Sequence, residues 1–266
     1  MLTAAHYYTP KFKQILAWLY KSHEDANFTY GLTELNQVYL AHTLSIVTTC
    51  AYERVQAYLR EPLEDGDLQR HVIERSRQRP YRYYSDARCE FGRRIGWYAL
   101  VRLIKPRVVV ETGVDKGLGS VLLCSALLRN QSEGFPGHYY GTDIDPNAGY
   151  LLAAPYNTVG EILYGDSIES IEQLDGIELF INDSDHSSDY ERREYQVIAS
   201  KLTDRAIIIG DNAHCNGELA SFSQNHRRKF LFFREEPLGH WYPGAGIGIS
   251  FPMSVDEGRD EQSRNT

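Results

Sequence analysis

The sequence lacks the marks of a secreted or membrane-spanning protein. No window approaches the roughly 18 consecutive apolar residues that a membrane span needs, and the amino-terminal segment MLTAAHYYTPKFKQ has no continuous apolar run typical of a signal peptide. The four cysteines are scattered and form no C-x-x-C pair, so we interpret them as reduced packing residues. These absences predict a soluble, cytoplasmic protein without membrane contacts.

Positive charge is also in short supply. With 28 Lys and Arg against 36 Asp and Glu, the net charge of −8 argues against a general nucleic-acid binder. The chain has no internal repeat. It does have 266 residues, of which 42% are hydrophobic and 24% charged, enough for one large α/β domain with an added element.

The chain is organised around a strand, a glycine-rich turn and a helix near its middle. The β-branched run Arg107–Glu111 is typical of a buried parallel strand, and it ends on an acid. The loop after it contains Gly113, Gly117 and Gly119, and Ser120 opens an apolar helical stretch. Glycines let the backbone take positive φ and approach a ligand, and a helix N-terminus offers free N–H groups. The pattern predicts a site for a nucleotide-type ligand.

The spacing of the glycines distinguishes between two such ligands. The dinucleotide fingerprint is G-x-G-x-x-G with an acid about twenty residues on, whereas this turn is G-x-x-x-G-x-G with an acid just before it. The pattern resembles motif I of the class I S-adenosylmethionine-dependent methyltransferases. The resemblance implies that Glu111 handles the amino group of the methionine moiety, and that the turn lines the cofactor with Gly113, Gly117, Gly119 and Ser120. The alternatives are an NAD-type Rossmann oxidoreductase, a non-catalytic cofactor-binding scaffold, or a turn that only tightens packing.

Acids also close the next two predicted strands. The segment His138–Asp145 is predicted as the second strand, and its Asp143 matches the acid that binds both ribose hydroxyls in these methyltransferases, because one carboxylate can accept from two neighbouring OH groups. Asp145, which precedes a proline, is predicted to cap the next turn. Glu161–Tyr164 is predicted as the third strand, and the resemblance assigns Asp166 to the adenine amino group. Ligands of open α/β sheets bind at this carboxyl edge.

Two further strands end in clusters of oxygen-bearing side chains. The run IELFI leads into Asp183 and His186, and the run AIIIG leads into Asp211 and Asn212. Because successive strands deliver their carboxyl ends to the same sheet edge, we expect these oxygens to converge. Ligation by oxygens alone suits Mg²⁺. The alternative is that Asp183 only caps the turn and that His186 is exposed.

This arrangement resembles the divalent-metal-dependent catechol and caffeoyl-CoA O-methyltransferases, whose D-x-D-K element and D-N pair hold the metal. The resemblance implies Asp183, Asp211 and Asn212 as metal ligands, with Asp183 also bordering the cofactor. His186 stands where that family has a lysine base, and the D-S-D-H-S form also resembles a broader bacterial methyltransferase group. The expected reaction is Mg²⁺-assisted methylation of a hydroxyl on a small molecule (a natural product, sugar or phenol), with His186 or, as a second candidate, His214 taking the proton.

The predicted fold is a mostly parallel, Rossmann-like α/β sheet whose last strand is antiparallel, preceded by a helical extension. The predicted boundaries are residues 1–84 for the extension, 85–252 for the S-adenosylmethionine-binding domain and 253–266 for a disordered tail. A first helix is expected to begin at Thr9 and Pro10 and to bury its apolar face. We expect the extension to cover the active site or to form the contact of a homodimer or higher homo-oligomer.

Two aromatic segments have open interpretations. Arg75–Arg94 alternates arginines with tyrosines, and the acidic composition favours a solvated hinge over a stacking surface for nucleic acid. A lid that meets an anionic or aromatic substrate is the intermediate interpretation. Near the end, His240, Trp241 and Tyr242 lie in the turn of a predicted hairpin, where they border the substrate or pack the hairpin.

Overall fold

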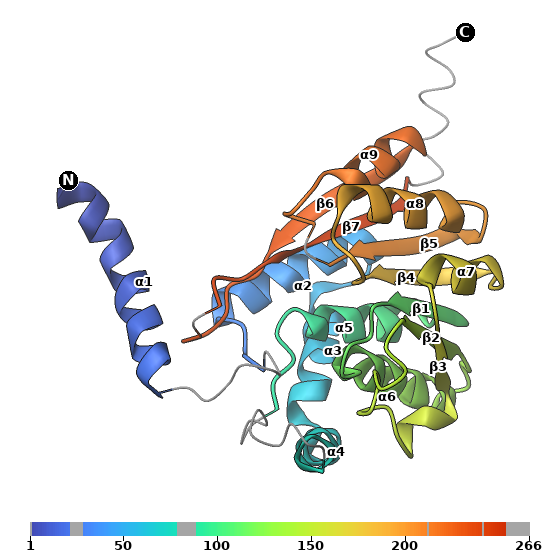
Figure 1. Ribbon diagram of the computed structural model, residues 1–266, viewed down its shortest axis with the longest axis horizontal. Coiled ribbons are helices and arrows are strands. Elements are labelled where there is room, and N and C mark those ends of the chain that lie inside the picture. Colours follow the sequence, from blue (N-terminus) through green and yellow to red (C-terminus); the bar gives the residue numbers. More distant parts are fainter. Residues whose placement is uncertain (1, 22–28, 79–88, 212, 241, 254–266) are drawn as a thin grey trace, which may run out of the picture.

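One mixed sheet forms the centre of the protein. The computed structural model describes residues 2–21, 29–78, 89–211, 213–240 and 242–253, and within them seven strands pair in the order β3-β2-β1-β4-β5-β7-β6 (Figure 1). The first five in this order are parallel, whereas β7 runs antiparallel to both β5 and β6. The strands are β1 (Val108–Thr112), β2 (His138–Asp143), β3 (Gly160–Tyr164), β4 (Ile177–Asn182), β5 (Leu202–Gly210), β6 (Arg228–Arg234) and β7 (Gly246–Pro252). The predicted fold class is confirmed.

Helices cover both faces of the sheet, which explains why its central strands are apolar throughout (Figure 1). Alternate residues of β1 and β4 point to opposite faces: Val109 and Leu179 join one hydrophobic cluster, and Val110 and Phe180 join the other. The first cluster contains residues of α2 to α6, and the second contains residues of α7 to α9. These helices are α2 (Glu34–Thr48), α3 (Tyr52–Glu64), α4 (Gly66–Arg77), α5 (Arg94–Ile104), α6 (Leu118–Ser132), α7 (Ser167–Glu172), α8 (Ser188–Ile198) and α9 (Glu218–Asn225), with a short 3₁₀ helix, η2 (Tyr156–Thr158), before β3.

The helical extension is fastened to the carboxyl-terminal hairpin. Thr33 caps α2, as its side chain accepts from the Asn36 backbone N–H. The Thr33 N–H donates to the Glu236 carbonyl at 3.0 Å, and the Leu238 N–H donates to the Gly31 carbonyl at 2.7 Å. Helices α2 to α4 therefore share one core with the sheet, and the segment before α2 lies against the loop between β6 and β7.

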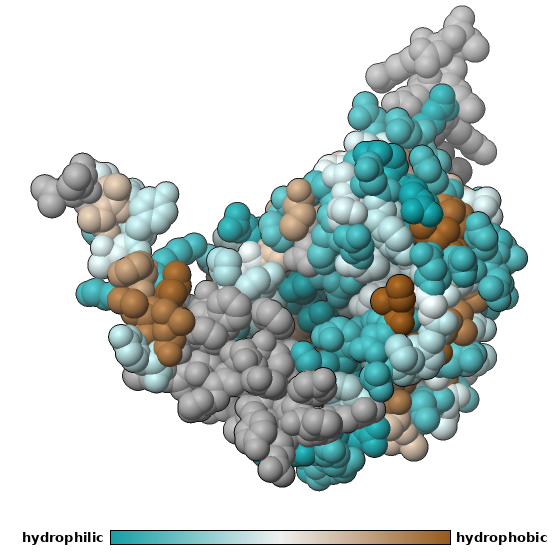
Figure 2. Space-filling model, viewed as in Figure 1, coloured by the Kyte–Doolittle hydropathy of each residue, from teal (hydrophilic) through white to brown (hydrophobic). Residues whose placement is uncertain are grey.

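Helix α1 (Leu2–Lys21) differs from its prediction. It begins well before Thr9, and Pro10 lies inside it. The large apolar side chains that the structure describes on this helix are exposed rather than buried, with Phe12 at 62% and Leu19 at 61%, and Figure 2 shows brown side chains gathered there. The periodicity predicted an apolar face correctly, but a periodic pattern does not say what covers that face.

Two further sequence expectations concern the predicted tail and the absence of a membrane-spanning segment. Of the predicted tail, residues 254–266 lie outside the described part of the chain. Among the described residues, no helix combines the length and the apolar character needed to cross a membrane.

Candidate active site

The carboxyl ends of β1, β4 and β5 lie in register and bring together three predicted site residues, Gly113, Asp183 and Asp211. Thr112 pairs with Asn182, and Asn182 pairs with Gly210, so the next residue of each strand lies at the same sheet edge. Backbone bonds fix this edge, because the Asp183 N–H donates to the Thr112 carbonyl at 2.9 Å and the Asp211 N–H donates to the Asn182 carbonyl at 2.8 Å.

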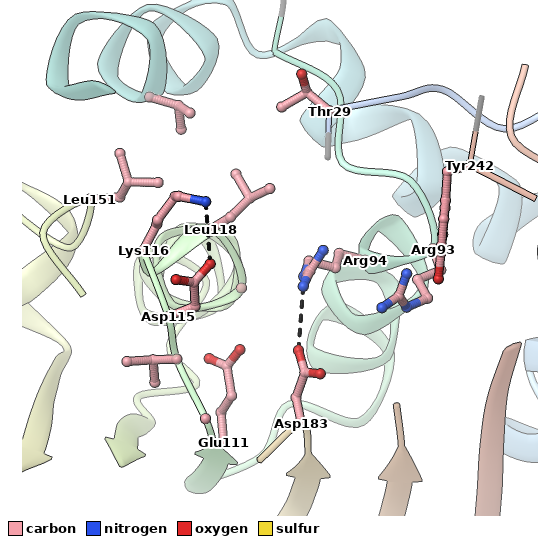
Figure 3. Close-up of a pocket in the computed structure, with 14 residues that line it drawn as sticks. Thr29, Arg93, Arg94, Glu111, Asp115, Lys116, Leu118, Leu151, Asp183 and Tyr242 are labelled. Carbon is pink, nitrogen blue, oxygen red and sulfur yellow. Dashed lines mark hydrogen bonds and ion pairs between the residues drawn. The ribbon is translucent and has the colours of Figure 1, made fainter. Parts of the chain in front are cut away.

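Two cavities open along this edge. One, of about 270 Å³, is lined by residues that include Glu111, Asp183 and Arg94 (Figure 3). The other, of about 480 Å³, is lined by residues that include Asp143 and Asp166. Both are lined by the same three residues where they meet: Gly113, Asp115 and Asp183. Pockets of this size suit small ligands, and here two of them lie next to each other across shared lining residues.

Glu111 is a buried acid whose environment changes its ionisation. Its side chain points from the end of β1 into the smaller cavity (Figure 3). It accepts a hydrogen bond from the Tyr139 hydroxyl and another, at 3.3 Å, from the Ser120 hydroxyl. Burial raises the pKa of Glu111 to about 7, although the bond from Tyr139 opposes the shift. A positive ligand group beside it would hold the carboxylate form. Through its hydrogen bond, Ser120 helps to position the Glu111 carboxylate.

The predicted glycines have separate physical reasons. At Gly113, where φ is +77°, a Cβ would lie 2.2 Å from the Asp183 carbonyl oxygen. At Gly119 a Cβ would lie 2.1 Å from Glu111 Oε1, so this glycine makes room for the acid. Gly117 has φ of +89° and caps α6 in the left-handed region, where L-residues are strained. Gly113 combines both constraints, because its φ is positive and the atom that a Cβ would meet belongs to the backbone.

The larger cavity contains the two acids predicted to hold the nucleoside. Asp143 Oδ2 accepts from the Asp115 N–H, and Oδ1 accepts from the Asp145 N–H, both at 2.9 Å. These bonds fix the carboxylate at the end of β2. Asp166 accepts from the Ile168 N–H at 2.8 Å and so caps α7. Asp145 accepts from the Asn147 N–H, as expected of a turn cap.

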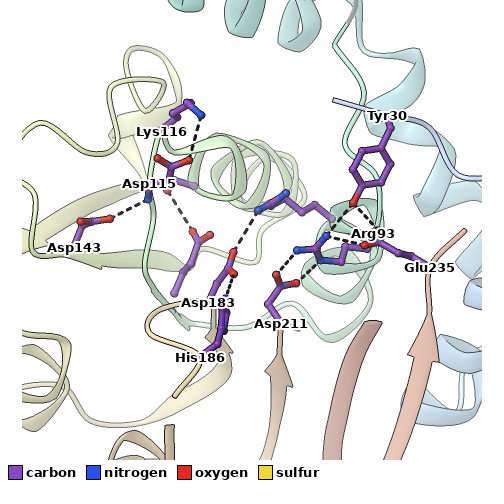
Figure 4. Close-up of polar contacts among 12 residues, drawn as sticks. Tyr30, Arg93, Asp115, Lys116, Asp143, Asp183, His186, Asp211 and Glu235 are labelled. Atoms are coloured by element: carbon purple, nitrogen blue, oxygen red, sulfur yellow. Dashed lines mark hydrogen bonds and ion pairs between the residues drawn. The ribbon is translucent and has the colours of Figure 1, made fainter. Parts of the chain in front are cut away.

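Two arginines that the sequence analysis placed in a hinge enter the site instead. Arg93 is 6% exposed, and its Nε and Nη2 donate to the two carboxylate oxygens of Asp211 (Figure 4). Its Nη1 donates at 2.9 Å to Glu235 and also to the Tyr30 hydroxyl. Arg94 forms an ion pair with Asp183, with Nη2 and Oδ2 3.3 Å apart. The solvated-hinge interpretation is wrong for both arginines, because buried acids from β4, β5 and the final hairpin surround them. Residues 79–88 of that segment lie outside the described part.

The acids in this cluster differ in protonation. Burial raises the pKa of Asp183 well above its usual range, and the nearby Asp211 carboxylate adds to the shift. Burial acts on Asp211 in the same sense, but the Arg93 guanidinium overcomes it and lowers the pKa of Asp211. The two acids are close enough to titrate together, and Asp183 is the member that holds the proton more tightly.

The two predicted bases lie outside both cavities. His186 is near Asp183, with Nε2 and Oδ1 3.9 Å apart (Figure 4), but it lines neither cavity. Its Nδ1 is 3.5 Å from Glu191, and this interaction raises the pKa of His186. His214 is exposed and lies beside Cys215, among the residues that line a separate surface pocket near α9. Of the two, only His186 adjoins the cluster.

The described residues do not fit the predicted Mg²⁺ site. Asn212 lies outside the described part, and among the described residues no group of three or more His, Cys, Asp or Glu is arranged to hold a metal ion. Asp183 and Asp211 do converge as predicted, but the oxygens of Asp211 already accept from Arg93. A divalent cation needs carboxylate oxygens free to coordinate it. No step below is derived through a metal.

Sequence reasoning missed the residues that complete the cluster from afar. Tyr30 donates to Glu235 at 2.7 Å across 205 positions of the chain. Its ring lies 5.1 Å from that of His240 and 5.6 Å from that of Tyr242, and Tyr242 lines the smaller cavity. Trp241 lies outside the described part. One local signal could have indicated that Arg93 is buried and Arg94 partly buried. They follow the apolar residue Phe91 closely, in a segment whose apolar side chains must enter the core.

Known proteins share the sequence pattern and the fold. Residues 110–213 match a family model described as a methyltransferase domain. The SAH-bound methyltransferase PaMTH1 from Podospora anserina has 15% identity and a TM-score of 0.51, over 76% of this chain and 95% of that one. The O-methyltransferase TomG from Streptomyces achromogenes, in complex with SAM, has 14% identity and a TM-score of 0.51, over 72% of this chain and 91% of that one. No curated protein matches the chain in sequence.

At these identities the solved structures establish the fold, and the matched domain spans β1 to β5 with the acids described above. Residues 110–213 thus match a methyltransferase domain model, and the solved structures share the fold that the resemblance to S-adenosylmethionine-dependent methyltransferases predicted.

Proposed function

We propose that this protein transfers the methyl group of S-adenosylmethionine to a hydroxyl oxygen of a small molecule. The observation that carries the proposal is the pair of adjacent cavities that share Gly113 and Asp183 in their linings. In the proposal, Asp143 binds the ribose hydroxyls and Asp166 the adenine amino group in the larger cavity. Glu111 pairs with the ammonium group at the start of the smaller one. These acids suit the cofactor because an ionised carboxylate accepts hydrogen bonds and pairs with positive charge, and the ribose hydroxyls, the adenine amino group and the ammonium group supply these partners.

The smaller cavity then receives the acceptor. Its volume of about 270 Å³ admits a small molecule. Apolar side chains from separate parts of the chain line it beside the acids: Val72 of α4, Leu118 of α6 and Leu151. Thr29 and Tyr242 also line this cavity, so the segment before α2 and the final hairpin contribute to acceptor selection. The acceptor class that we propose is a small hydroxylated compound with apolar surface, not a nucleic acid.

The chain's own residues supply positioning and a route for the proton. S-adenosylmethionine supplies an electrophilic methyl carbon on a sulfonium. Asp183, which lines both cavities, orients the acceptor hydroxyl and accepts its proton as the oxygen–carbon bond forms and the carbon–sulfur bond breaks. The form that accepts the proton is the Asp183 carboxylate paired with Arg94. Because burial and the nearby Asp211 raise the pKa of Asp183, this carboxylate is a stronger base than an ordinary aspartate. His186, 3.9 Å behind it, receives the proton in turn. The expectation of Mg²⁺ is not part of this proposal, because Arg93 already occupies the Asp211 oxygens.

Calorimetry with S-adenosylhomocysteine tests the cofactor half of the proposal. The full chain should bind one equivalent, and Asp143→Asn should weaken binding at least about tenfold, as about 1.4 kcal/mol, within the range for a lost hydrogen bond to a charged group, is a factor of ten. Asp145→Asn is the matched control: it is exposed, lies on the same turn and should bind as the wild type does. Binding of NAD instead would move the protein to the oxidoreductase class.

A coupled assay for S-adenosylhomocysteine release tests the catalytic half. A panel of small phenols, sugars and aliphatic alcohols should contain acceptors that raise release above the rate without acceptor. Cofactor binding with no transfer to any hydroxylated compound would support a non-catalytic scaffold.

A further inference from the structure

The structure contains a pair of cations at the point where the sequence pattern predicted a metal ion. Arg93 immediately precedes α5, and Arg94 is its first residue. Arg93 binds Asp211, just after β5, and Arg94 pairs with Asp183, just after β4 (Figure 3). Arg93 binds Asp211 through Nε and Nη2, while Nη1 binds Glu235 and Tyr30. The Arg93 guanidinium thus donates these hydrogen bonds to oxygen atoms of three buried residues.

The burial of this network makes displacement of Arg93 unfavourable. Asp211 and Glu235 are both fully buried, at 0% exposure, and Tyr30 is 2% exposed. The Glu235 carboxylate also accepts from the Ala245 N–H at 2.8 Å, so the final hairpin holds it in place. A divalent cation on Asp211 would have to remove the Arg93 guanidinium and leave that charge buried nearby, and an unpaired buried charge is costly.

Arg94 differs from Arg93 in facing the cavity. Its side chain is 18% exposed and lines the smaller cavity, with the guanidinium carbon 5.0 Å from the centre of the Trp97 ring. Its single ion pair, to Asp183, is 3.3 Å long. Among the residues the structure describes, Arg94 Nε has no hydrogen-bond partner. A charged donor thus stands beside the acid that orients the acceptor.

Methyl transfer to a hydroxyl requires stabilisation of the negative charge that develops on the acceptor oxygen as its proton leaves. A fixed guanidinium can provide it, because its N–H donors strengthen as the oxygen becomes anionic. We infer that Arg94 fulfils this role, that Arg93 takes the place of a divalent cation at Asp211, and that the site works without a metal. The inference rests on the proposed function and deepens it. A guanidinium can donate to a single oxygen of the acceptor molecule. An acceptor with one hydroxyl is therefore a suitable substrate, and it does not need two neighbouring oxygens to chelate a metal ion.

Titration of the metal-stripped full chain with Mn²⁺, followed by electron paramagnetic resonance, tests the inference without any acceptor. The wild type should show no stoichiometric binding, with or without S-adenosylhomocysteine. Arg93→Met frees both oxygens of Asp211 and should gain a Mn²⁺ site. One Mn²⁺ bound per wild-type chain, lost in Asp211→Asn and retained in the exposed control Asp189→Asn, would overturn the inference. A folded Arg93→Met protein that binds no Mn²⁺ would contradict the place given to Arg93.

Arg94→Met provides the second test. Among the described residues it removes a long ion pair and a contact with the Trp97 ring, far less than the buried network that Arg93→Met disrupts, so it should fold even if Arg93→Met does not. With an acceptor from the panel, it should lose about 10²–10³-fold in kcat, the range for one lost oxyanion donor. Affinity for S-adenosylhomocysteine should be unchanged, and added Mg²⁺ should not restore the rate. Arg94→Lys should recover part of it, and the exposed control Arg70→Met should behave as wild type. Unchanged kcat in Arg94→Met would refute the role of Arg94. Absence of S-adenosylhomocysteine binding in the wild type would refute the proposed function instead, while the Mn²⁺ result would still be readable.

Discussion

Substitution of Gly113 by alanine should destabilise the protein by about 2–5 kcal/mol. A non-glycine residue in the left-handed region costs about 1–2 kcal/mol, and Gly113 has φ of +77°. The added Cβ would also lie 2.2 Å from the Asp183 carbonyl oxygen and 2.7 Å from the Ser184 Cα, both of them backbone atoms that cannot rotate away. Overpacking of this kind costs about a further 1–3 kcal/mol.

Gly134→Ala separates the two contributions. Gly134 has φ of +88°, and a Cβ there would meet nothing within 4 Å, so this variant carries the conformational cost alone. Urea denaturation of both variants should show Gly113→Ala to be less stable by about 1–3 kcal/mol, the part due to the collision. Equal losses in the two variants would refute the claim that the ends of β1 and β4 are packed against each other. Calorimetry should also show weaker S-adenosylhomocysteine binding in Gly113→Ala alone, since the collision displaces Asp183 from the point where the two cavities meet.

Three more predictions follow from the charged and apolar groups. Because Glu111 must be ionised to pair with an ammonium group and its pKa is raised to about 7, affinity for S-adenosylhomocysteine should fall as the pH drops below about 7; calorimetry across pH should show the same fall in Asp145→Asn but not in Glu111→Gln. His186→Ala should lose about 10²–10⁴-fold in kcat with cofactor binding intact. The Glu191 contact raises the pKa of His186 from its ordinary value of 6.5, so the wild-type rate should fall as the pH drops through this raised pKa and His186 becomes protonated. A His186→Ala variant with the same pH profile as the wild type would count against His186. Deletion of residues 1–28 removes the exposed Phe12 and Leu19, so light scattering should show a homodimer for the full chain and a monomer for the deletion; a monomeric full chain would contradict this.

Local patterns in the sequence were sufficient to place the residues predicted to bind the cofactor at one edge of the sheet, while their binding role stays a prediction. The acid before the glycine turn, the glycine spacing and the acid at the end of β2 all lie within one strand–turn–helix–strand segment, and their positions follow from strand ends. The structure adds a reason that a motif cannot contain, namely that Gly119 leaves room for the Glu111 carboxylate. Convergence of Asp183 and Asp211 was also predictable, because parallel neighbours end at the same edge.

The acceptor side was not predictable in the same way, because its contacts join distant parts of the chain. Arg93 meets Asp211 across 118 positions and Glu235 across 142. An alternation of arginine and tyrosine is compatible with a solvated surface or with a buried network, and only the partners decide between them. The metal prediction had the same weakness. A sequence pattern can show that two acids converge, but it does not show whether a metal cation or a guanidinium binds them.

A crystal structure of the full chain with S-adenosylhomocysteine tests the central claim most directly. The account predicts the adenosine in the cavity lined by Asp143 and Asp166, the ammonium beside Glu111, and the sulfur over Gly113 facing Asp183 and Arg94. A ligand bound elsewhere, or one whose sulfur faces away from the smaller cavity, would contradict it.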